Sequence, residues 1–349
     1  MLIQKLKQCL ITAILPQKQY ILWKMKRSFI HDVVEKHYPF IYDKETTATT
    51  NRPTAHTIIA MCNGFMRHGG LSDRFLGITS SFLYAKKNGV NFAISWTSPF
   101  NLQDYLVPNR YDWTIAPNNV IYNRPIACPI CIGSIYKMCG TDKQKEEKTQ
   151  QQLINSIIKK HPKAQQYHLY SNAHFATSQY HDLFNELFKP SPWLQQIINK
   201  HLTLLGENYT AMTFRFVHLL ADFKDTTQAT ETLSANERQA YINDCINVIK
   251  QVHQRCNNSR ILVTSDSETF LNEAKCLPYV YIADGKVTHI DNLATTTANN
   301  SADKEFADLF LLARAKKIYR VHKGKMYYSG FPLTAAMIGN TEVETIELT

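Results

Sequence analysis

Short apolar runs alternate with amphipathic stretches along residues 205–349. The apolar runs predict buried strands of a parallel sheet, and the amphipathic stretches predict the helices between them. Predicted strands begin at residues 209, 260, 279 and 317, and residues 343–348 alternate like an edge strand. Predicted helices cover residues 269–275, 307–315 and 332–338. A further helix opens at Ser234, where Glu237 completes a capping box. This order predicts one doubly wound α/β domain.

A similar alternation begins in the first half of the chain. A strand, a glycine-bearing loop, a helix and a second strand are predicted in turn over residues 57–96. Gly69 and Gly70 in this loop would allow the backbone to approach a ligand closely, although an ordinary turn uses glycine as well. A chain of 349 residues is too long for one ordinary core. We therefore predict three parts, namely residues 1–50, 51–204 and 205–349.

Arg215 stands out because it lies at the end of the apolar strand that begins at residue 209. A buried guanidinium needs an anion. One interpretation is a clamp for a diphosphate, since the planar donors of arginine match phosphate oxygens. The other is an internal salt bridge to Asp222 or Asp308. Ligands of doubly wound sheets bind at the carboxyl ends of the strands, which favours the phosphate. Residues predicted at such ends are Arg215, Ser265, Asp266, Ser329 and Gly330.

The chain carries 39 basic and 29 acidic residues, a formal net charge of +10. This surplus favours nucleotide phosphates, an anionic membrane surface or nucleic acid as partner. Residues 1–30 contain Lys and Arg but no acidic residue, interleaved with apolar residues. This basic segment is predicted either to contact an anionic membrane peripherally or to pack as a helix on the first domain. Without a membrane-spanning run or a secretory signal, we expect a cytoplasmic protein, either free or peripheral at the inner face of the membrane.

Two further groups of residues leave alternatives open. Cys128, Cys131 and Cys139 lie close in sequence, but no fourth Cys or suitably spaced His completes a zinc site. We therefore predict reduced thiols, no metal and no cofactor. Some aromatic residues could either stack on a flat ligand or pack in the core. They are Trp96, Trp113, Tyr327 and Tyr328.

Four segments, taken together and in order, resemble the motifs of the fucosyltransferases that use GDP-fucose. This group includes the core α1,6-, the α1,2- and the protein O-fucosyltransferases, and the chain resembles a bacterial-type member. The four segments are Gly69–Gly77, Thr213–Arg215 with Asp222, Val263–Asp266 and Phe306–Ala336. Their spacing and order agree across most of the chain, from about residue 55 to residue 340. The chain departs from the group at Thr213, where the group usually has His, and Asp222 follows the arginine later than usual.

The resemblance implies a GT-B fold, in which two Rossmann-like doubly wound domains face each other across a cleft. Residues 51–204 would form the acceptor-side domain and residues 205–349 the domain that binds the nucleotide sugar. It implies an inverting, metal-independent glycosyltransferase that moves fucose from GDP-fucose to a glycan acceptor. Arg215 would hold the β-phosphate, and Asp308 would accept hydrogen bonds from guanine. The implied donor-binding residues are Gly69, Gly70, Thr213, Arg215, Asp266, Asp308, Ser329 and Gly330.

The chemistry of the residues agrees with a metal-free transfer. No Asp lies two positions from another, so the chain lacks the Asp-x-Asp element through which the other major glycosyltransferase fold holds a metal. A metal-free enzyme must neutralise the leaving diphosphate with fixed cations and amides, and Arg215 is the candidate. The acceptor hydroxyl needs a base, for which Asp222 is the first candidate and Asp225 the second. Asp222 could equally be the carboxylate that fixes Arg215.

The sequence is also compatible with other functions. A related GT-B enzyme could use another nucleotide sugar, and a basic nucleic-acid-binding protein would also carry this charge. Such binders concentrate Lys and Arg on one element, whereas the arginines near the motifs here are single, so no nucleic acid is expected. His218 and His289 could each be structural or touch a ligand. Residues 97–200 contain no motif that indicates the acceptor.

Overall fold

The computed structural model describes most of the chain from residue 56 onward. The described residues are 42, 56–64, 68–123, 126–132, 143–172, 177–223, 231–257, 259–287, 290 and 302–348. The predicted membrane contact of the basic segment lies outside them. The chain divides into two compact units. The first comprises Met1–Gly69, Asp73–Ser98 and Tyr111–Thr177, and the second comprises Gly70–Ser72, Pro99–Arg110 and Ser178–Thr349.

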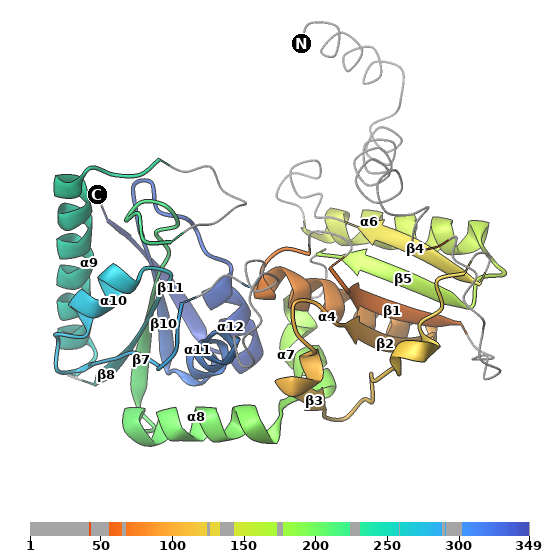
Figure 1. The fold of residues 1–349 in the computed structure, drawn as a ribbon, viewed down its shortest axis with the longest axis horizontal. Helices are drawn as coiled ribbons and strands as arrows, with labels where there is room; N and C mark the ends of the chain where they lie inside the picture. Colours follow the sequence, from red (N-terminus) through yellow and green to blue (C-terminus); the bar gives the residue numbers. More distant parts are fainter. Residues whose placement is uncertain are drawn as a thin grey trace, which may run out of the picture. The chain divides into compact units, whose positions relative to one another are not determined.

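The first unit is built on a parallel sheet of four strands in the order β2-β1-β5-β4. The strands are β1 (Thr57–Cys62), β2 (Asn91–Trp96), β4 (Ala127–Ile132) and β5 (Gln166–Ser171), and the helices are α4 (Leu71–Asn88) and α6 (Lys143–Lys160) (Figure 1). Tyr84 of α4 donates a hydrogen bond to Asn155 of α6, so the two helices pack side by side. Buried Tyr42 packs with Ile59 and Met61 of β1.

The second unit contains a parallel sheet of five strands in the order β11-β10-β7-β8-β9. The strands are β7 (Tyr209–Phe214), β8 (Arg260–Ser265), β9 (Val280–Tyr281), β10 (Lys317–Lys323) and β11 (Glu342–Leu348). The helices are α9 (Ala235–Arg255), α10 (Glu268–Ala274), α11 (Asp303–Arg314) and α12 (Phe331–Gly339). Helices α9 and α10 cover one face of this sheet, and α11 and α12 cover the other (Figure 1). The predicted doubly wound domain is therefore confirmed.

Side-chain alternation explains how the central strand β7 serves both faces. Met212 and Phe214 pack in the hydrophobic core formed with α9 and α10. Because successive side chains of a strand point to opposite faces, Thr213 points toward α11 and α12. On that face the Tyr209 hydroxyl donates to the carbonyl oxygen of Leu311 in α11. The strand is buried along its whole length, as expected of a parallel strand covered on both sides.

Residues before the predicted boundary at residue 204 also belong to the second unit. They form α7 (Tyr180–Leu187), α8 (Pro192–Leu205) and a small antiparallel sheet of β3 (Leu106–Pro108) and β6 (Phe188–Pro190). Helix α8 packs against α11, and its apolar side buries Leu194 and Ile198. Burial of this apolar side attaches α8 to the second unit.

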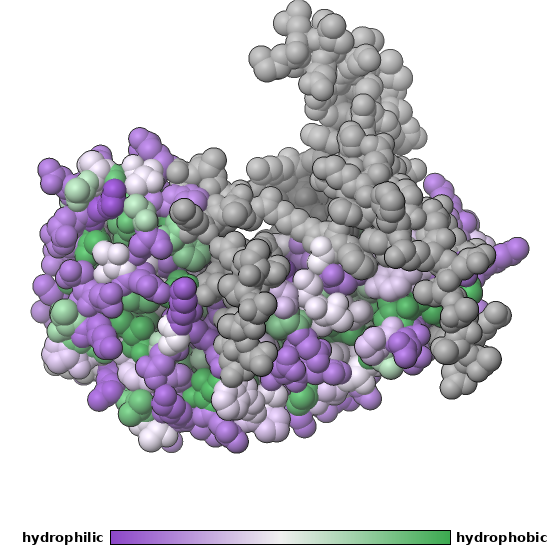
Figure 2. All heavy atoms as spheres, in the orientation of Figure 1, coloured by the Kyte–Doolittle hydropathy of each residue, from purple (hydrophilic) through white to green (hydrophobic). Residues whose placement is uncertain are grey.

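Two surface properties of the described residues complete the fold. Hydrophilic residues cover most of the visible surface of the second unit, with small apolar groups between them (Figure 2). Within the parts of the chain that the structure describes, no helix is both long and apolar enough to cross a bilayer.

Candidate functional site

Arg215 directly follows β7 and is held from two sides. Its Nε lies 3.4 Å from Oδ2 of Asp266, and its guanidinium carbon lies 5.0 Å from the ring centre of Phe223. Arg215 thus forms an internal salt bridge, but its carboxylate is Asp266 rather than Asp222 or Asp308, which contact the start of α10 and Lys304. The Arg215 side chain is still 21% exposed, whereas that of Asp266 is 2% exposed. The guanidinium therefore combines a fixed position with access to solvent.

Asp266 follows β8 and ties the loop after β7 to the end of β8. Its Oδ1 accepts the N–H of Phe216 at 2.8 Å, and its Oδ2 accepts the N–H of Val217 at 2.7 Å. Burial raises the pKa of the Asp266 carboxyl, while Arg215 and these two N–H groups act to lower it. Val217 has a φ of 57°, which a β-branched residue rarely adopts. Asp266 therefore stabilises a strained loop that carries Arg215.

Asp222 attaches the other end of this loop to α10. It is exposed, and its Oδ2 accepts hydrogen bonds from Ser267 Oγ at 2.7 Å and from the N–H of Thr269 at 2.8 Å. A carboxylate at a helix N-terminus interacts favourably with the unpaired amides there. Asp222 is thus held in one orientation by the start of α10. Asp225, the second candidate base, lies outside the described residues.

The loop after β10 reaches the same edge of the sheet. The N–H of Tyr327 donates to the carbonyl oxygen of Arg215 at 3.0 Å. Two residues further on, Ser329 Oγ accepts the N–H of Phe331 at 3.2 Å, at the start of α12. Gly330 is exposed, and a Cβ placed there would meet nothing within 4 Å. Arg215, Ser329 and Gly330 are therefore brought to one edge, as their positions at strand ends predicted.

Thr213 and Asp308 lie on the α11 side of the sheet. The Thr213 hydroxyl is buried and has no hydrogen-bond partner among the described residues. Asp308 of α11 is also buried, and its Oδ2 lies 3.1 Å from Nζ of Lys304, which donates to the carbonyl oxygen of Ala283 as well. Burial raises the pKa of Asp308, and Lys304 opposes this shift. Lys304 and Asp308 are four residues apart in α11, but Lys304 precedes the helix predicted at residues 307–315, so the sequence prediction did not indicate this pair.

Glu305 in the first turn of α11 has an environment that the sequence does not reveal. Both of its carboxyl oxygens are buried and have no hydrogen-bond partner within the described part of the chain. Burial raises the pKa of Glu305 to about 8. An acidic residue at this position looks like an ordinary residue that favours the start of a helix, so no local pattern pointed to its burial.

Gly69 and Gly70 lie directly before α4. Gly69 has a φ of 77°, and its carbonyl oxygen accepts the Arg74 Nε–H at 3.0 Å. A Cβ at Gly69 would lie 2.5 Å from Oδ2 of Asp73, so the turn requires glycine here. The role of both glycines in donor binding remains a prediction.

The aromatic, histidine and cysteine residues singled out in the sequence lie partly in the core and partly at the surface. Trp96 and Trp113 are buried, so packing explains these two aromatic residues. Tyr327 and Tyr328 are 42% and 50% exposed. His218 is partly buried in the loop after β7, and His289 lies outside the described residues. Cys128 and Cys131 are free thiols, and among the described residues no three His, Cys, Asp or Glu side chains gather as metal ligands would.

Comparison with known proteins identifies the fold. No protein-family model and no curated protein sequence matches this chain. The ligand-free structure of POFUT1 superposes with a TM-score of 0.52 at 11% sequence identity, over 85% of this chain and 99% of that chain. The chain has the POFUT1 fold. The predicted fold class is therefore confirmed, with two Rossmann-like α/β units of the kind found in GT-B fucosyltransferases.

Structures of a second enzyme are also similar. The α1,6-fucosyltransferase NodZ soaked with GDP-fucose has a TM-score of 0.49 at 11% identity, over 81% of this chain and 92% of that chain. NodZ from Bradyrhizobium has a TM-score of 0.47 at 11% identity, over 81% of this chain and 93% of that chain. POFUT1 itself has been solved in complex with GDP-fucose.

Proposed function

We propose that the chain is an inverting glycosyltransferase that transfers fucose from GDP-fucose to a glycan acceptor without a metal. The observation that carries this proposal is the position of Arg215. A partly exposed guanidinium, fixed by Asp266, follows the central strand of a parallel sheet at its carboxyl end. This is the edge of a doubly wound sheet at which nucleotide ligands bind.

Arg215 would act on the leaving GDP. In a transition state resembling an oxocarbenium ion, negative charge grows on the oxygen that departs with the β-phosphate. A cation fixed before the reaction stabilises this charge without reorganisation, so it lowers the barrier more than it strengthens ground-state binding. Ser329 and Gly330 would offer the amides at the start of α12 to the other diphosphate oxygens. Asp266 would keep Arg215 aligned, and Gly69 and Gly70 would approach the donor by their backbone.

Asp308 and Thr213 would recognise the nucleobase. Guanine presents N–H groups whose hydrogen bonds a carboxylate can accept. Asp308 would accept these hydrogen bonds in place of its contact with Lys304. The buried hydroxyl of Thr213 would gain the hydrogen-bond partner that it lacks among the described residues. Lys304 places a cation beside Asp308, the residue expected to accept hydrogen bonds from guanine. This contact supports a second candidate function, a GT-B enzyme that uses a different nucleotide sugar.

Asp222 is the proposed base for the acceptor hydroxyl. Inversion requires proton removal on the side of the sugar opposite the leaving group. The two hydrogen bonds to Oδ2 hold the carboxylate in one orientation, which would direct Oδ1 to an acceptor without a further loss of side-chain freedom. Asp225 is the alternative base.

The test is incubation with GDP-fucose and a glycan array, read by mass spectrometry. We expect fucosylated products with wild type, and transfer lowered roughly a hundredfold or more in Arg215→Ala. The matched control is Arg260→Ala, because Arg260 begins β8 at the opposite end of the same sheet and is exposed. Parallel thermal shifts with GDP and with UDP test the choice of nucleotide. Product formation that is unchanged in Arg215→Ala would contradict the proposed role of Arg215.

A further inference from the structure

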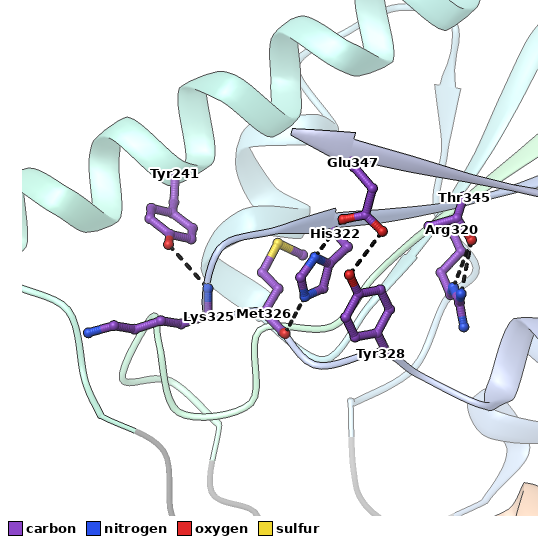
Figure 3. A network of polar contacts seen from close by, with 8 residues as sticks. All are labelled: Tyr241, Arg320, His322, Lys325, Met326, Tyr328, Thr345 and Glu347. Atoms are coloured by element: carbon purple, nitrogen blue, oxygen red, sulfur yellow. Dashed lines mark hydrogen bonds and ion pairs between the residues drawn. The ribbon is translucent and has the colours of Figure 1, made fainter. Parts of the chain in front are cut away.

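His322 of β10 is the centre of a polar network at the same edge of the sheet (Figure 3). Its Nδ1 lies 2.9 Å from Oε2 of Glu347 in β11, and its Nε2 lies 2.8 Å from the carbonyl oxygen of Met326. The ring of Tyr328 stacks on the imidazole at 3.6 Å, and its hydroxyl donates to Oε1 of Glu347. The His322 side chain is 10% exposed, whereas that of Glu347 is 55% exposed.

Both partners of the His322 ring are hydrogen-bond acceptors. A carbonyl oxygen only accepts hydrogen bonds, and an ionised carboxylate only accepts as well. Partial burial acts to raise the pKa of Glu347, but hydrogen bonds from Tyr328 and His322 outweigh it, and the pKa lies below its usual value. Glu347 is therefore a carboxylate at neutral pH. The two ring contacts form together as hydrogen bonds only when both ring nitrogens carry hydrogen, as they do in an imidazolium.

The network holds the loop between β10 and α12. Met326, which His322 contacts, precedes Tyr327, whose N–H donates to the carbonyl oxygen of Arg215. At the far end of the loop, the carbonyl oxygen of Ser329 lies 3.5 Å from Nη1 of Arg320. The contacts of His322 are thus one residue away from the backbone of Arg215.

We propose that His322, as an imidazolium, is a positioning residue that fixes this loop against Arg215 and thereby shapes the anion site. The role rests on the proposed function, because it presumes that Arg215 and the start of α12 hold a diphosphate. Loss of the proton removes one of the two hydrogen bonds, and the loop that joins Met326 to Arg215 loosens.

The charged and titratable groups around His322 are compatible with this role. Glu347 of β11 and Tyr328 of the loop contact it directly. The guanidinium of Arg320 lies 5.3 Å from the ring centre of Tyr328. The other groups nearby are Tyr241 of α9, Arg215 after β7, and Lys323 and Lys325, which pair with Asp244 and Glu231. Only Glu347 among these contacts the ring with a full negative charge.

The experiment compares wild type, His322→Gln and a matched control, His253→Gln. His253 also stacks on a tyrosine, Tyr279, at 3.5 Å, and contacts the carbonyl oxygen of Ser259, but it lies near the end of α9. The first measurement is hydrogen exchange of the Tyr327 amide at pH 6, with each rate divided by its intrinsic rate. The reference is the Lys316 amide, which donates to the carbonyl oxygen of Tyr209.

We expect His322→Gln to lose roughly tenfold protection at Tyr327, with Lys316 unchanged and His253→Gln like wild type. Equal Tyr327 protection in wild type and His322→Gln overturns the proposal, whether or not the protein binds a nucleotide.

The second measurement is GDP affinity by calorimetry at pH 6 and pH 8.5. The ratio of wild-type to His322→Gln affinity cancels the titration of GDP itself. We expect a ratio of about ten at pH 6 that approaches one at pH 8.5. A ratio that does not change with pH overturns the imidazolium role. If wild type binds no GDP at all, the proposed function fails, and the exchange of Tyr327 alone decides whether His322 positions the loop.

Discussion

The Arg215 guanidinium and the Asp266 carboxylate form a salt bridge in which the carboxylate also holds the backbone of the arginine's own loop. Nε of Arg215 lies 3.4 Å from Oδ2 of Asp266, and the same oxygen accepts the N–H of Val217 at 2.7 Å. The pair thus fixes both the side chain and the main chain of the segment after β7. In the proposed function, this pair would hold a cation in place before any ligand arrives.

Replacement of Asp266 by Asn should be strongly destabilising. The amide keeps one acceptor but directs N–H groups at Phe216, Val217 or Arg215, all of which donate. We expect a loss of about 2–4 kcal/mol in the free energy of unfolding, measured by urea denaturation. Asp244→Asn, in a half-exposed pair with Lys323, serves as control and should cost less than about 1 kcal/mol. Equal losses in the two variants would show that Asp266 does not support the loop.

The Asp222→Asn variant distinguishes two roles of Asp222, namely holding the start of α10 and acting as the catalytic base. Asn keeps an acceptor oxygen for Ser267 and Thr269, so α10 and the loop should stay in place. If Asp222 is the base, kcat for fucose transfer should fall roughly a hundredfold or more, while the free energy of unfolding changes by less than about 1 kcal/mol. Kinetics and denaturation of the same preparation check this. A folded variant with wild-type kcat would restrict Asp222 to anchoring α10.

The sheet of the second unit could be predicted because its buried strands read as continuous apolar runs. The Ser234–Glu237 capping box likewise located the start of α9, and both of its hydrogen bonds are present. The pairing of Arg215 with Asp266 was also within reach. Phe214 and Ser265 are register partners in neighbouring parallel strands, so the residues that follow them meet. The sequence did not show that β8 is the strand beside β7 in the sheet.

Other features depend on packing that no local pattern carries. Helix α8 reads as an ordinary amphipathic helix, and its tertiary contacts, above all with α11, assign it to the second unit. The burial of Glu305 depends on what surrounds the first turn of α11 rather than on its neighbours in sequence. His322 gains its role from Glu347, which a parallel register brings opposite it across 25 residues.

The buried carboxyl of Glu305 should make stability depend on pH. Its pKa is about 8 in the folded state against a usual value of 4.5, so the folded state binds the proton more tightly. The stabilisation that results from this tighter proton binding is fully present below about pH 4.5, and it is lost as the pH rises to about 8. Relative to Glu305→Gln, wild type should lose roughly 2–4 kcal/mol between pH 5 and 8.5.

Urea denaturation at several pH values measures this difference for Glu305. Glu207→Gln provides the control, because Glu207 is exposed before β7 and should leave the pH dependence of wild type unchanged. Parallel pH profiles of wild type and Glu305→Gln would mean that the Glu305 carboxyl is solvated in the folded protein.

Lys304→Met tests the buried pair in α11. The substitution leaves Asp308 buried without its cation, and we expect a loss of about 3 kcal/mol in the free energy of unfolding. Lys200→Met is the matched control, because Lys200 pairs with Asp284 at the surface and should cost less than about 1 kcal/mol. Urea denaturation of both variants decides the matter. Comparable small losses would indicate that Asp308 finds another partner.

The proposed binding of a GDP-sugar diphosphate by Arg215 predicts a loss of GDP affinity when the guanidinium is replaced. Its most direct test is calorimetric titration of wild type, Arg215→Lys and the control Arg260→Lys with GDP and with UDP. Lysine keeps the charge but loses the planar fork, so GDP affinity should fall about 10- to 100-fold in Arg215→Lys. Arg260→Lys should match wild type, and wild type should prefer GDP to UDP. GDP binding that is absent in wild type, or equal in Arg215→Lys and wild type, would contradict the account.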